Sequence, residues 1–352
     1  MKSNKTFFGT IVIVFFLSVL FMSCASKQSV QTTEKFYRNH LSDNVSINIS
    51  KPESPHENKE GHDWIRLNNG QYMEYLKIGN QGETIIFVCG ILDDSIVTFS
   101  NMPDLIKKAK KGRCQLLFVN LPGNGYSSIP DPQFFNPIYL KLCFEEFITK
   151  MKLKEFTLIG NSNGCLVSVL LTSCQNCDKD FKIKNLLGFN PLLKDVSFWE
   201  MDKYQKLLVK SPSNVVQSII QTPLIGYQVI KFTLGSVENK WVWNVDKQTV
   251  VSFYNRLSKK NRCGIWSAYL KNAIQMTPEL RKISNEIYQN ISQLTDKVIL
   301  YSNPGDNWVP HYHVKEIADK MNVTYKKLGS GHIPQRTYAK LVEKEILSVL
   351  NL

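Results

Sequence analysis

The segment of this chain best suited to chemistry is Gly160-Asn161-Ser162-Asn163-Gly164. Residues 155–159 before it are apolar enough to predict a buried strand, and the apolar residues 165–171 after it predict a helix. Gly-x-Ser-x-Gly between a strand and a helix is the pattern of a nucleophile elbow, a tight turn that lifts a serine hydroxyl above a sheet edge. Glycine suits the two flanking positions because the turn has no room for side chains there. The Gly-x-Ser-x-Gly pattern alone is a weak signal, so the prediction depends on the strand before it and the helix after it.

Strand-like and helix-like segments alternate on both sides of this pentad. The predicted strands are 84–90, 114–120, 155–159, 184–189, 297–301 and 323–328, of which the first three are expected to be buried. The predicted helices are 101–110, 137–151, 165–171, 313–321 and 338–350. Ahead of them, two alternating runs flank Asn68-Asn69-Gly70, which predicts a β-hairpin. Alternating strands and helices predict an α/β domain with a doubly wound, mostly parallel sheet.

This pattern is interrupted between residues 191 and 293, where strand-like runs vanish and aromatic residues recur on helix-like segments. We therefore expect a helical lid inserted into a core domain made of residues 63–190 and 294–352. Two roles for its aromatic side chains remain open at this point, namely lining an acyl pocket or forming the core of the insertion.

The N-terminus has the features of a targeting segment. Residues 1–23 combine Lys2 and Lys5 with a largely apolar run, as in a signal peptide. Cys24 follows a small residue and resembles the cleavage site of a bacterial lipoprotein, although Phe21 stands where leucine is usual. An uncleaved anchor helix and plain secretion are the alternatives, and residues 24–62 are expected to form a polar tether. Lipidation of Cys24 would place the protein in the bacterial cell envelope, anchored to the membrane and facing outside the cytoplasm.

The formal charge of this 352-residue chain is +13, and removal of Lys2 and Lys5 with the signal peptide would leave 13 − 2 = +11. The basic residues are scattered, so we expect no nucleic-acid partner. A basic surface could instead face anionic lipid headgroups, or simply be solvated.

The positions of the cysteines indicate buried core residues rather than metal ligands or redox-active thiols. Four cysteines lie inside apolar stretches and are expected to be buried: Cys89, Cys114, Cys143 and Cys165. Cys174 and Cys177 have no second Cys-x-x-Cys to complete a zinc or redox site, and a local disulfide between them stays open.

From about Asp63 to Leu352 the chain resembles the α/β-hydrolase superfamily. The matching motifs are Val88-Cys89-Gly90-Ile91, the loop 120–127 (Asn-Leu-Pro-Gly-Asn-Gly-Tyr-Ser), the Ser162 elbow, Gly305-Asp306-Asn307-Trp308-Val309-Pro310 and Gly331-His332-Ile333-Pro334. Serine, then acid, then histidine is also the chain order of this superfamily. The resemblance implies an α/β-hydrolase fold, while the segment predicted to be a lid resembles no family.

The resemblance also implies roles for three side chains. Ser162 would be the nucleophile, His332 the base that takes its proton, and Asp306 the carboxylate that orients the imidazole. Asp195 is the alternative acid. The oxyanion donors would be the backbone N–H groups of Ile91 and Asn163.

Two features near this site remain in question. The superfamily commonly has His-Gly before the first oxyanion donor, whereas this chain has Cys89-Gly90. His311 and His313 could suggest a metal pair, but no third ligand is evident, so we expect a solvated helix start and no metal.

These residues predict a serine hydrolase that cleaves carboxylic esters or related acyl bonds through an acyl-enzyme, with a small-molecule acyl substrate and no cofactor. The alternatives are a non-hydrolytic member of the fold, either an acyltransferase or a substrate-binding envelope lipoprotein with a vestigial triad, and a purely structural lipoprotein. The sequence determines neither the substrate nor the oligomeric state.

Overall fold

The computed structural model describes residues 49–172, 181–193, 213–234, 247–258, 295–304, 306, 308–329 and 331–352, with isolated positions between 265 and 291. The predicted signal peptide, Cys24, Cys174, Cys177 and the alternative acid Asp195 lie outside these residues.

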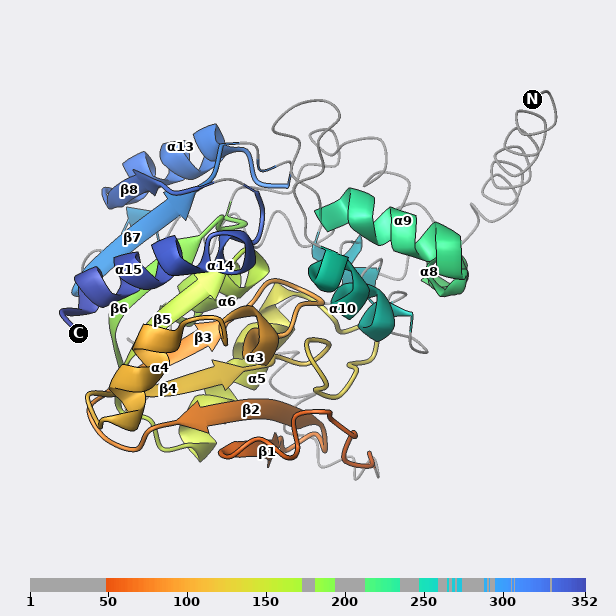
Figure 1. Ribbon diagram of the computed structural model, residues 1–352, viewed down its shortest axis with the longest axis horizontal. Coiled ribbons are helices and arrows are strands. Elements are labelled where there is room, and N and C mark those ends of the chain that lie inside the picture. The colour runs from red at the N-terminus through yellow and green to blue at the C-terminus, as the bar shows by residue number, and fades with distance from the viewer. Residues whose placement is uncertain are drawn as a thin grey trace.

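The core of the fold is an eight-stranded sheet in the order β1-β2-β4-β3-β5-β6-β7-β8 (Figure 1). Its strands are β1 (His62–Arg66), β2 (Tyr72–Ile78), β3 (Glu83–Val88), β4 (Cys114–Val119), β5 (Glu155–Asn161), β6 (Lys182–Phe189), β7 (Lys297–Ser302) and β8 (Thr324–Lys327). β1 and β2 form the predicted hairpin and pair antiparallel, as do β2 and β4. All the other pairs are parallel, which confirms the predicted doubly wound, mostly parallel sheet.

Helices cover both faces of the sheet (Figure 1). Their bounds are α3 (Ser95–Thr98), α4 (Pro103–Lys110), α5 (Pro137–Lys150), α6 (Asn163–Thr172), α13 (His311–Met321), α14 (Pro334–Thr337) and α15 (Ala339–Leu350). Alternate strand side chains pack with α5, α6 and α13 on one face and with α4 and α15 on the other. The parallel strands therefore bury both of their faces, which is why their sequences are nearly continuous apolar runs. Cys89, Cys114, Cys143 and Cys165 are buried, as expected, and these four form no disulfide bond.

The predicted elements differ from the structure mainly at short segments. The four-residue helices α3 and α14 were not predicted, because neither is long enough to show a helical period. The packed domain also begins earlier than the expected boundary at residue 63. His56 is buried and its Nε2 lies 3.0 Å from Asp94 Oδ2, and Ser54 donates to Glu74, so the end of the predicted polar tether is part of the domain.

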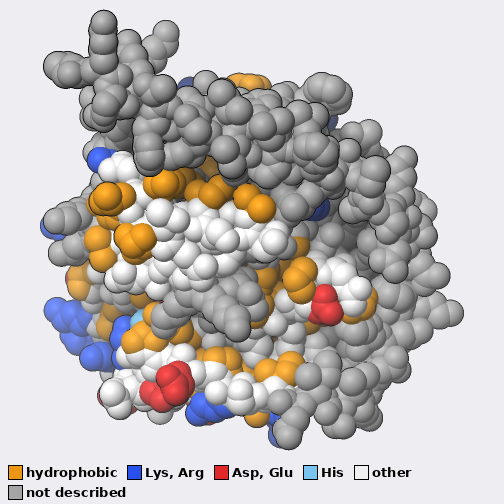
Figure 2. All heavy atoms as spheres, turned by 90° about the vertical axis from the view of Figure 1, so that its right-hand side faces the viewer, with side chains coloured by type: hydrophobic (Ala, Val, Ile, Leu, Met, Phe, Trp, Pro, Cys, Tyr) orange, Lys and Arg blue, Asp and Glu red, His pale blue; other side chains and the backbone are white. Residues whose placement is uncertain are grey.

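The described residues between β6 and β7 include three helices, namely α8 (Ser213–Gln221), α9 (Pro223–Leu234) and α10 (Lys247–Leu257). They share a small apolar core with Leu92 and Ile333 of the main domain. Their side of the molecule presents hydrophobic side chains at its surface (Figure 2). In α9, Leu224 and Ile225 are exposed. Within the described part of the chain, no helix combines the length and the hydropathy needed to cross a bilayer.

Candidate active site

Ser162 occupies the turn between β5 and α6, with a left-handed backbone (φ 52°) that is strained for any residue other than glycine. The flanking glycines make this turn possible. A Cβ atom at Gly160 would lie 2.6 Å from Cys165 Cα, and one at Gly164 would lie 2.3 Å from the carbonyl oxygen of Val88. Steric demands at the turn therefore explain both glycines of the predicted elbow.

The structure brings Ser162, His332 and Asp306 together in a continuous chain of hydrogen bonds. His332 Nε2 lies 2.9 Å from Ser162 Oγ. On the other side of the ring, Nδ1 lies 2.9 and 3.0 Å from the two carboxylate oxygens of Asp306. A carboxylate at Nδ1 favours the tautomer with hydrogen on Nδ1, which leaves Nε2 free to accept the serine proton.

Asp306 is held rigidly although its side chain is fully buried. Its Oδ1 accepts hydrogen bonds from the backbone N–H groups of Trp308 at 2.8 Å and Val309 at 3.1 Å. These donors compensate for the loss of water around a buried charge, and they orient the carboxylate toward His332.

Three asparagines at the carboxyl ends of neighbouring strands hold the backbone of the His332 loop. Asn161 ends β5 and donates to the His332 carbonyl, and Asn190, just after β6, donates to the carbonyls of both Gly331 and His332. The Asn303 side chain, just after β7, donates to the Gly331 carbonyl, and the Asn303 backbone N–H donates to Asn190 Oδ1. Side-chain amides from three strands therefore fix the height of the imidazole above the sheet.

The loop after β3 lies directly against the serine. A Cβ atom at Gly90 would lie 3.2 Å from Ser162 Cβ, so glycine permits the close approach of this loop. Asn124 clamps the loop, because it donates to the Gly90 carbonyl and accepts from the N–H of Leu92, a residue with φ of 60°. The Ile91 N–H lies between these two anchored positions and donates to no other described residue.

Asn163 begins α6, and its backbone N–H also donates to no other described residue. The position of this group at the N-terminus of a buried helix adds the favourable end of the helix dipole to any negative charge beside Ser162. The Asn163 side chain accepts a hydrogen bond from Tyr269, whose pKa is raised by burial, so the phenol remains a donor.

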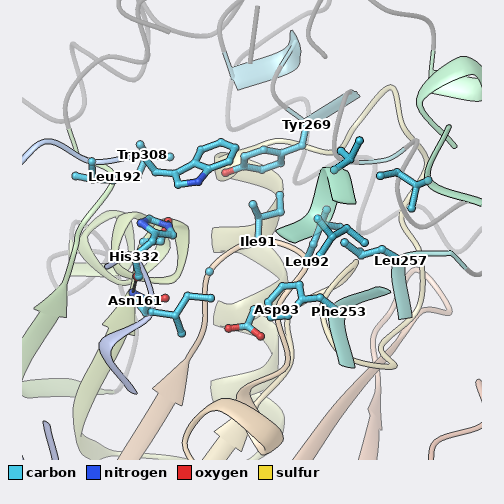
Figure 3. Close-up of a pocket in the computed structure, with 17 residues that line it drawn as sticks. Ile91, Leu92, Asp93, Asn161, Leu192, Phe253, Leu257, Tyr269, Trp308 and His332 are labelled. Atoms are coloured by element: carbon cyan, nitrogen blue, oxygen red, sulfur yellow. Dashed lines mark hydrogen bonds between the residues drawn. The ribbon is translucent and has the colours of Figure 1, made fainter. Parts of the chain in front are cut away.

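A pocket opens beside Ser162 (Figure 3). His332 and Trp308 lie on one side of it, and Phe253 and Leu257 of α10 lie on the other. Apolar side chains of three described helices complete the lining: Ile220, Val229, Ile230, Phe253 and Leu257. Cys165 does not offer a rival nucleophile, because burial strongly raises the pKa of its thiol.

Sequence reasoning did not assign functions to several residues that complete this site. Asn124 belongs to the loop 120–127, which matches the superfamily, but the sequence assigns it no role. Tyr269 is one of many aromatic residues in the predicted lid. His311 and His313 lie at the start of α13, and among the described residues no group of three His, Cys, Asp or Glu side chains could hold a metal ion.

Solved structures with this architecture share its topology. An α/β-hydrolase fold protein from Burkholderia ambifaria superposes with a TM-score of 0.63 at 14% identity, over 81% of this chain and 97% of its own. The chain has the α/β-hydrolase fold. An epoxide hydrolase gives a TM-score of 0.62 at 16% identity, over 82% of this chain and 97% of its own. A thermophilic esterase from Thermogutta terrifontis gives a TM-score of 0.60 at 11% identity, over 82% of this chain and 98% of its own.

No protein-family model and no curated protein sequence matches the chain. At these identities the structural similarity establishes the α/β-hydrolase fold alone, and the activity has to be argued from the site. The site lies at the carboxyl ends of the parallel strands, with Ser162 after β5, Asp306 after β7 and His332 after β8. This edge of the sheet is where open α/β folds bind their ligands.

Proposed function

We propose that this protein is a serine hydrolase that cleaves carboxylic esters or related acyl bonds through an acyl-enzyme on Ser162. The observation that carries the proposal is the unbroken series of hydrogen bonds from Asp306 through His332 to Ser162 Oγ. Serine is a weak nucleophile at neutral pH, and an adjacent base held by a carboxylate is the arrangement that activates it.

Acylation would begin with attack of Ser162 Oγ on the substrate carbonyl while His332 Nε2 takes the hydroxyl proton. The carbonyl oxygen becomes an oxyanion, and the N–H groups of Ile91 and Asn163 would stabilise its charge. Collapse of the tetrahedral intermediate breaks the bond to the leaving alcohol, and His332 returns the proton to that oxygen. Asp306 stabilises the imidazolium in between without accepting the proton itself.

Deacylation repeats these steps with water in place of the serine. His332 takes a proton from water, the hydroxide attacks the acyl carbonyl, and Ser162 Oγ leaves with the proton returned by His332. The products are a carboxylic acid and regenerated serine, so the cycle is balanced without a metal or an organic cofactor.

The pocket indicates an apolar acyl group of modest size. Its cavity of about 100 Å³ is somewhat smaller than the ~150 Å³ cavity that accommodates a benzene molecule in another protein. Aliphatic side chains and Phe253 dominate the wall farthest from His332. We therefore expect p-nitrophenyl butyrate to have a higher kcat/KM than the octanoate.

Truncation of the pocket wall is expected to change this preference. Leu257→Ala removes a buried side chain at the far wall and should raise the octanoate-to-butyrate ratio of kcat/KM by about 10-fold, because a longer chain gains room and apolar contact. Val251→Ala on the exposed side of the same helix is the matched control and should leave the ratio unchanged. A folded Leu257→Ala variant with the wild-type ratio would contradict this assignment of the acyl pocket.

Labelling with a fluorophosphonate probe tests the proposed function. The probe should label the wild type but not Ser162→Ala, because only an activated serine attacks it at a useful rate. Equal labelling of both proteins would refute the proposal. Labelling without turnover of any ester would instead favour the alternative of an acyltransferase or a substrate-binding protein.

We also propose that lipid attached to Cys24 anchors the protein in a bacterial envelope, with the catalytic domain outside the cytoplasm. A diacylglyceryl group adds two hydrocarbon chains, which is the number needed for stable membrane attachment. Cys24→Ser should move the protein from the detergent phase to the aqueous phase in a Triton X-114 partition. Retention of that variant in the detergent phase would point to an uncleaved anchor helix.

A further inference from the structure

A buried ion pair outside the triad includes a residue of the loop between β3 and α3 (residues 89–94), which carries the Ile91 N–H and is called the oxyanion loop below. Arg336 Nη2 lies 2.9 Å from Asp93 Oδ1, and both side chains are almost fully buried, at 6% and 3% exposure. Thr98 closes a ring with them, because its hydroxyl donates to Asp93 Oδ2 at 2.8 Å and accepts from Arg336 Nε at 3.1 Å. A buried pair with hydrogen bonds at both carboxylate oxygens holds its two chain segments in one relative position.

One member of the pair belongs to the loop after β3 and the other to the helix after the His332 loop, and the proposed reaction must align these two segments. Asp93 closely follows Ile91, the first oxyanion donor, and its own carbonyl accepts from the Gly125 N–H at 2.7 Å. Arg336 belongs to α14, the helix that directly follows the His332 loop. The contact thus joins positions 243 residues apart in the sequence, and Asp93 lines the same pocket as Ser162.

The same guanidinium also reaches the acyl pocket. Its central carbon lies 5.0 Å from the centroid of the Phe253 ring, within the range of a cation–π contact. Phe253 belongs to α10 and lines the pocket (Figure 3). The Arg336 side chain, carried by the helix that follows His332, therefore contacts both the loop after β3 and a helix of the segment between β6 and β7.

We propose that Arg336 is a positioning residue, which holds the Ile91 N–H and the His332 loop in mutual register through Asp93. This inference rests on the proposed serine hydrolase function. The oxyanion loop needs such a restraint because Leu92 has a strained left-handed backbone, and strained conformations persist only where surrounding contacts over-determine them. An N–H that moves by a fraction of an ångström loses alignment with an oxyanion, and misplacement of about 1 Å can cost about 100-fold in rate.

The test compares Arg336→Met, the double variant Asp93→Asn/Arg336→Met, and the control Arg66→Met. Arg66 is also a cationic side chain near a ring, 6.0 Å from that of Tyr72, but it is exposed on β1. The readouts are kcat and KM for p-nitrophenyl butyrate, inhibition by an alkylboronic acid, whose serine adduct resembles the tetrahedral intermediate, and the melting temperature.

Arg336→Met is expected to lower kcat by ~10- to 100-fold with little change in KM, because alignment matters only once the oxyanion forms. Boronate affinity should fall in parallel with kcat. The double variant should recover melting temperature, because no unpaired carboxylate remains buried, but its kcat should stay low. Arg66→Met should behave as the wild type.

Two results would overturn the inference: a kcat for Arg336→Met within about twofold of wild type, or recovery of kcat together with stability in the double variant. The second result would mean that the arginine serves stability alone, and it decides the matter even if Arg336→Met does not fold. If the wild type and Arg66→Met turn over no ester, the proposed function has failed rather than this inference.

Discussion

Replacing Ser162 with alanine is expected to lower kcat for p-nitrophenyl butyrate by about five to six orders of magnitude, with normal folding. The variant loses the only hydroxyl hydrogen-bonded to His332 Nε2 among the described residues. Without that oxygen no acyl-enzyme forms. The backbone N–H groups of Ile91 and Asn163 can then stabilise only a slow direct attack by water on the ester. Steady-state kinetics and circular dichroism on the purified variant provide the measurement.

Ser168→Ala is the matched control for this experiment. Ser168 is buried in α6, near the elbow, and its hydroxyl donates to the Gly164 carbonyl at 2.8 Å rather than to the triad. It should retain near wild-type kcat. Comparable activity losses in both variants would indicate a disturbed helix instead of a lost nucleophile.

Gly164→Ala is expected to have a large structural effect, because an added methyl group at this position meets the backbone of the neighbouring strand. The new Cβ would lie 2.3 Å from the Val88 carbonyl oxygen and 2.4 Å from that of Cys89, distances that backbone atoms cannot accommodate without moving. The N-terminus of α6 would have to move away from the end of β3, which separates the two proposed oxyanion donors. We expect a loss of about 3 kcal/mol or more in the free energy of unfolding, together with loss of activity.

Gly112→Ala tests whether this effect is specific to the elbow. Gly112 has φ of 72°, and an added methyl there meets only the flexible side chain of Gln81. The expected cost is the ~1–2 kcal/mol of a left-handed alanine, with activity retained. Equal destabilisation of the two variants in urea unfolding would contradict the packing described for the elbow.

The sequence predicted the central strands and the elbow because their signals are local. Buried parallel strands appear as continuous apolar runs, and the glycines flanking Ser162 are required by contacts made within a few residues of the turn or with the adjacent strand β3. Asp306 and His332 were found through the motifs around them, and the structure places both within hydrogen-bonding distance of each other.

The remaining parts of the site depend on contacts between distant segments, which local patterns do not encode. Nothing in the sequence near Arg336 indicates a partner at Asp93, because the fold alone brings these residues together. The same holds for the asparagines at the ends of β5, β6 and β7, which act jointly on the His332 loop. The sequence places His56 in a polar tether, because its partner Asp94 lies 38 residues further along the chain, after β3, and no local pattern connects the two.

Direct capture of the covalent intermediate tests the central claim. Wild-type protein mixed with p-nitrophenyl butyrate, quenched in acid during turnover and digested should yield one peptide carrying an added butyryl group, with Ser162 as the modified residue. His332→Ala should yield little of this adduct, because the serine would lack its base. Turnover without an adduct on Ser162, or a butyryl group on another side chain, would contradict the account.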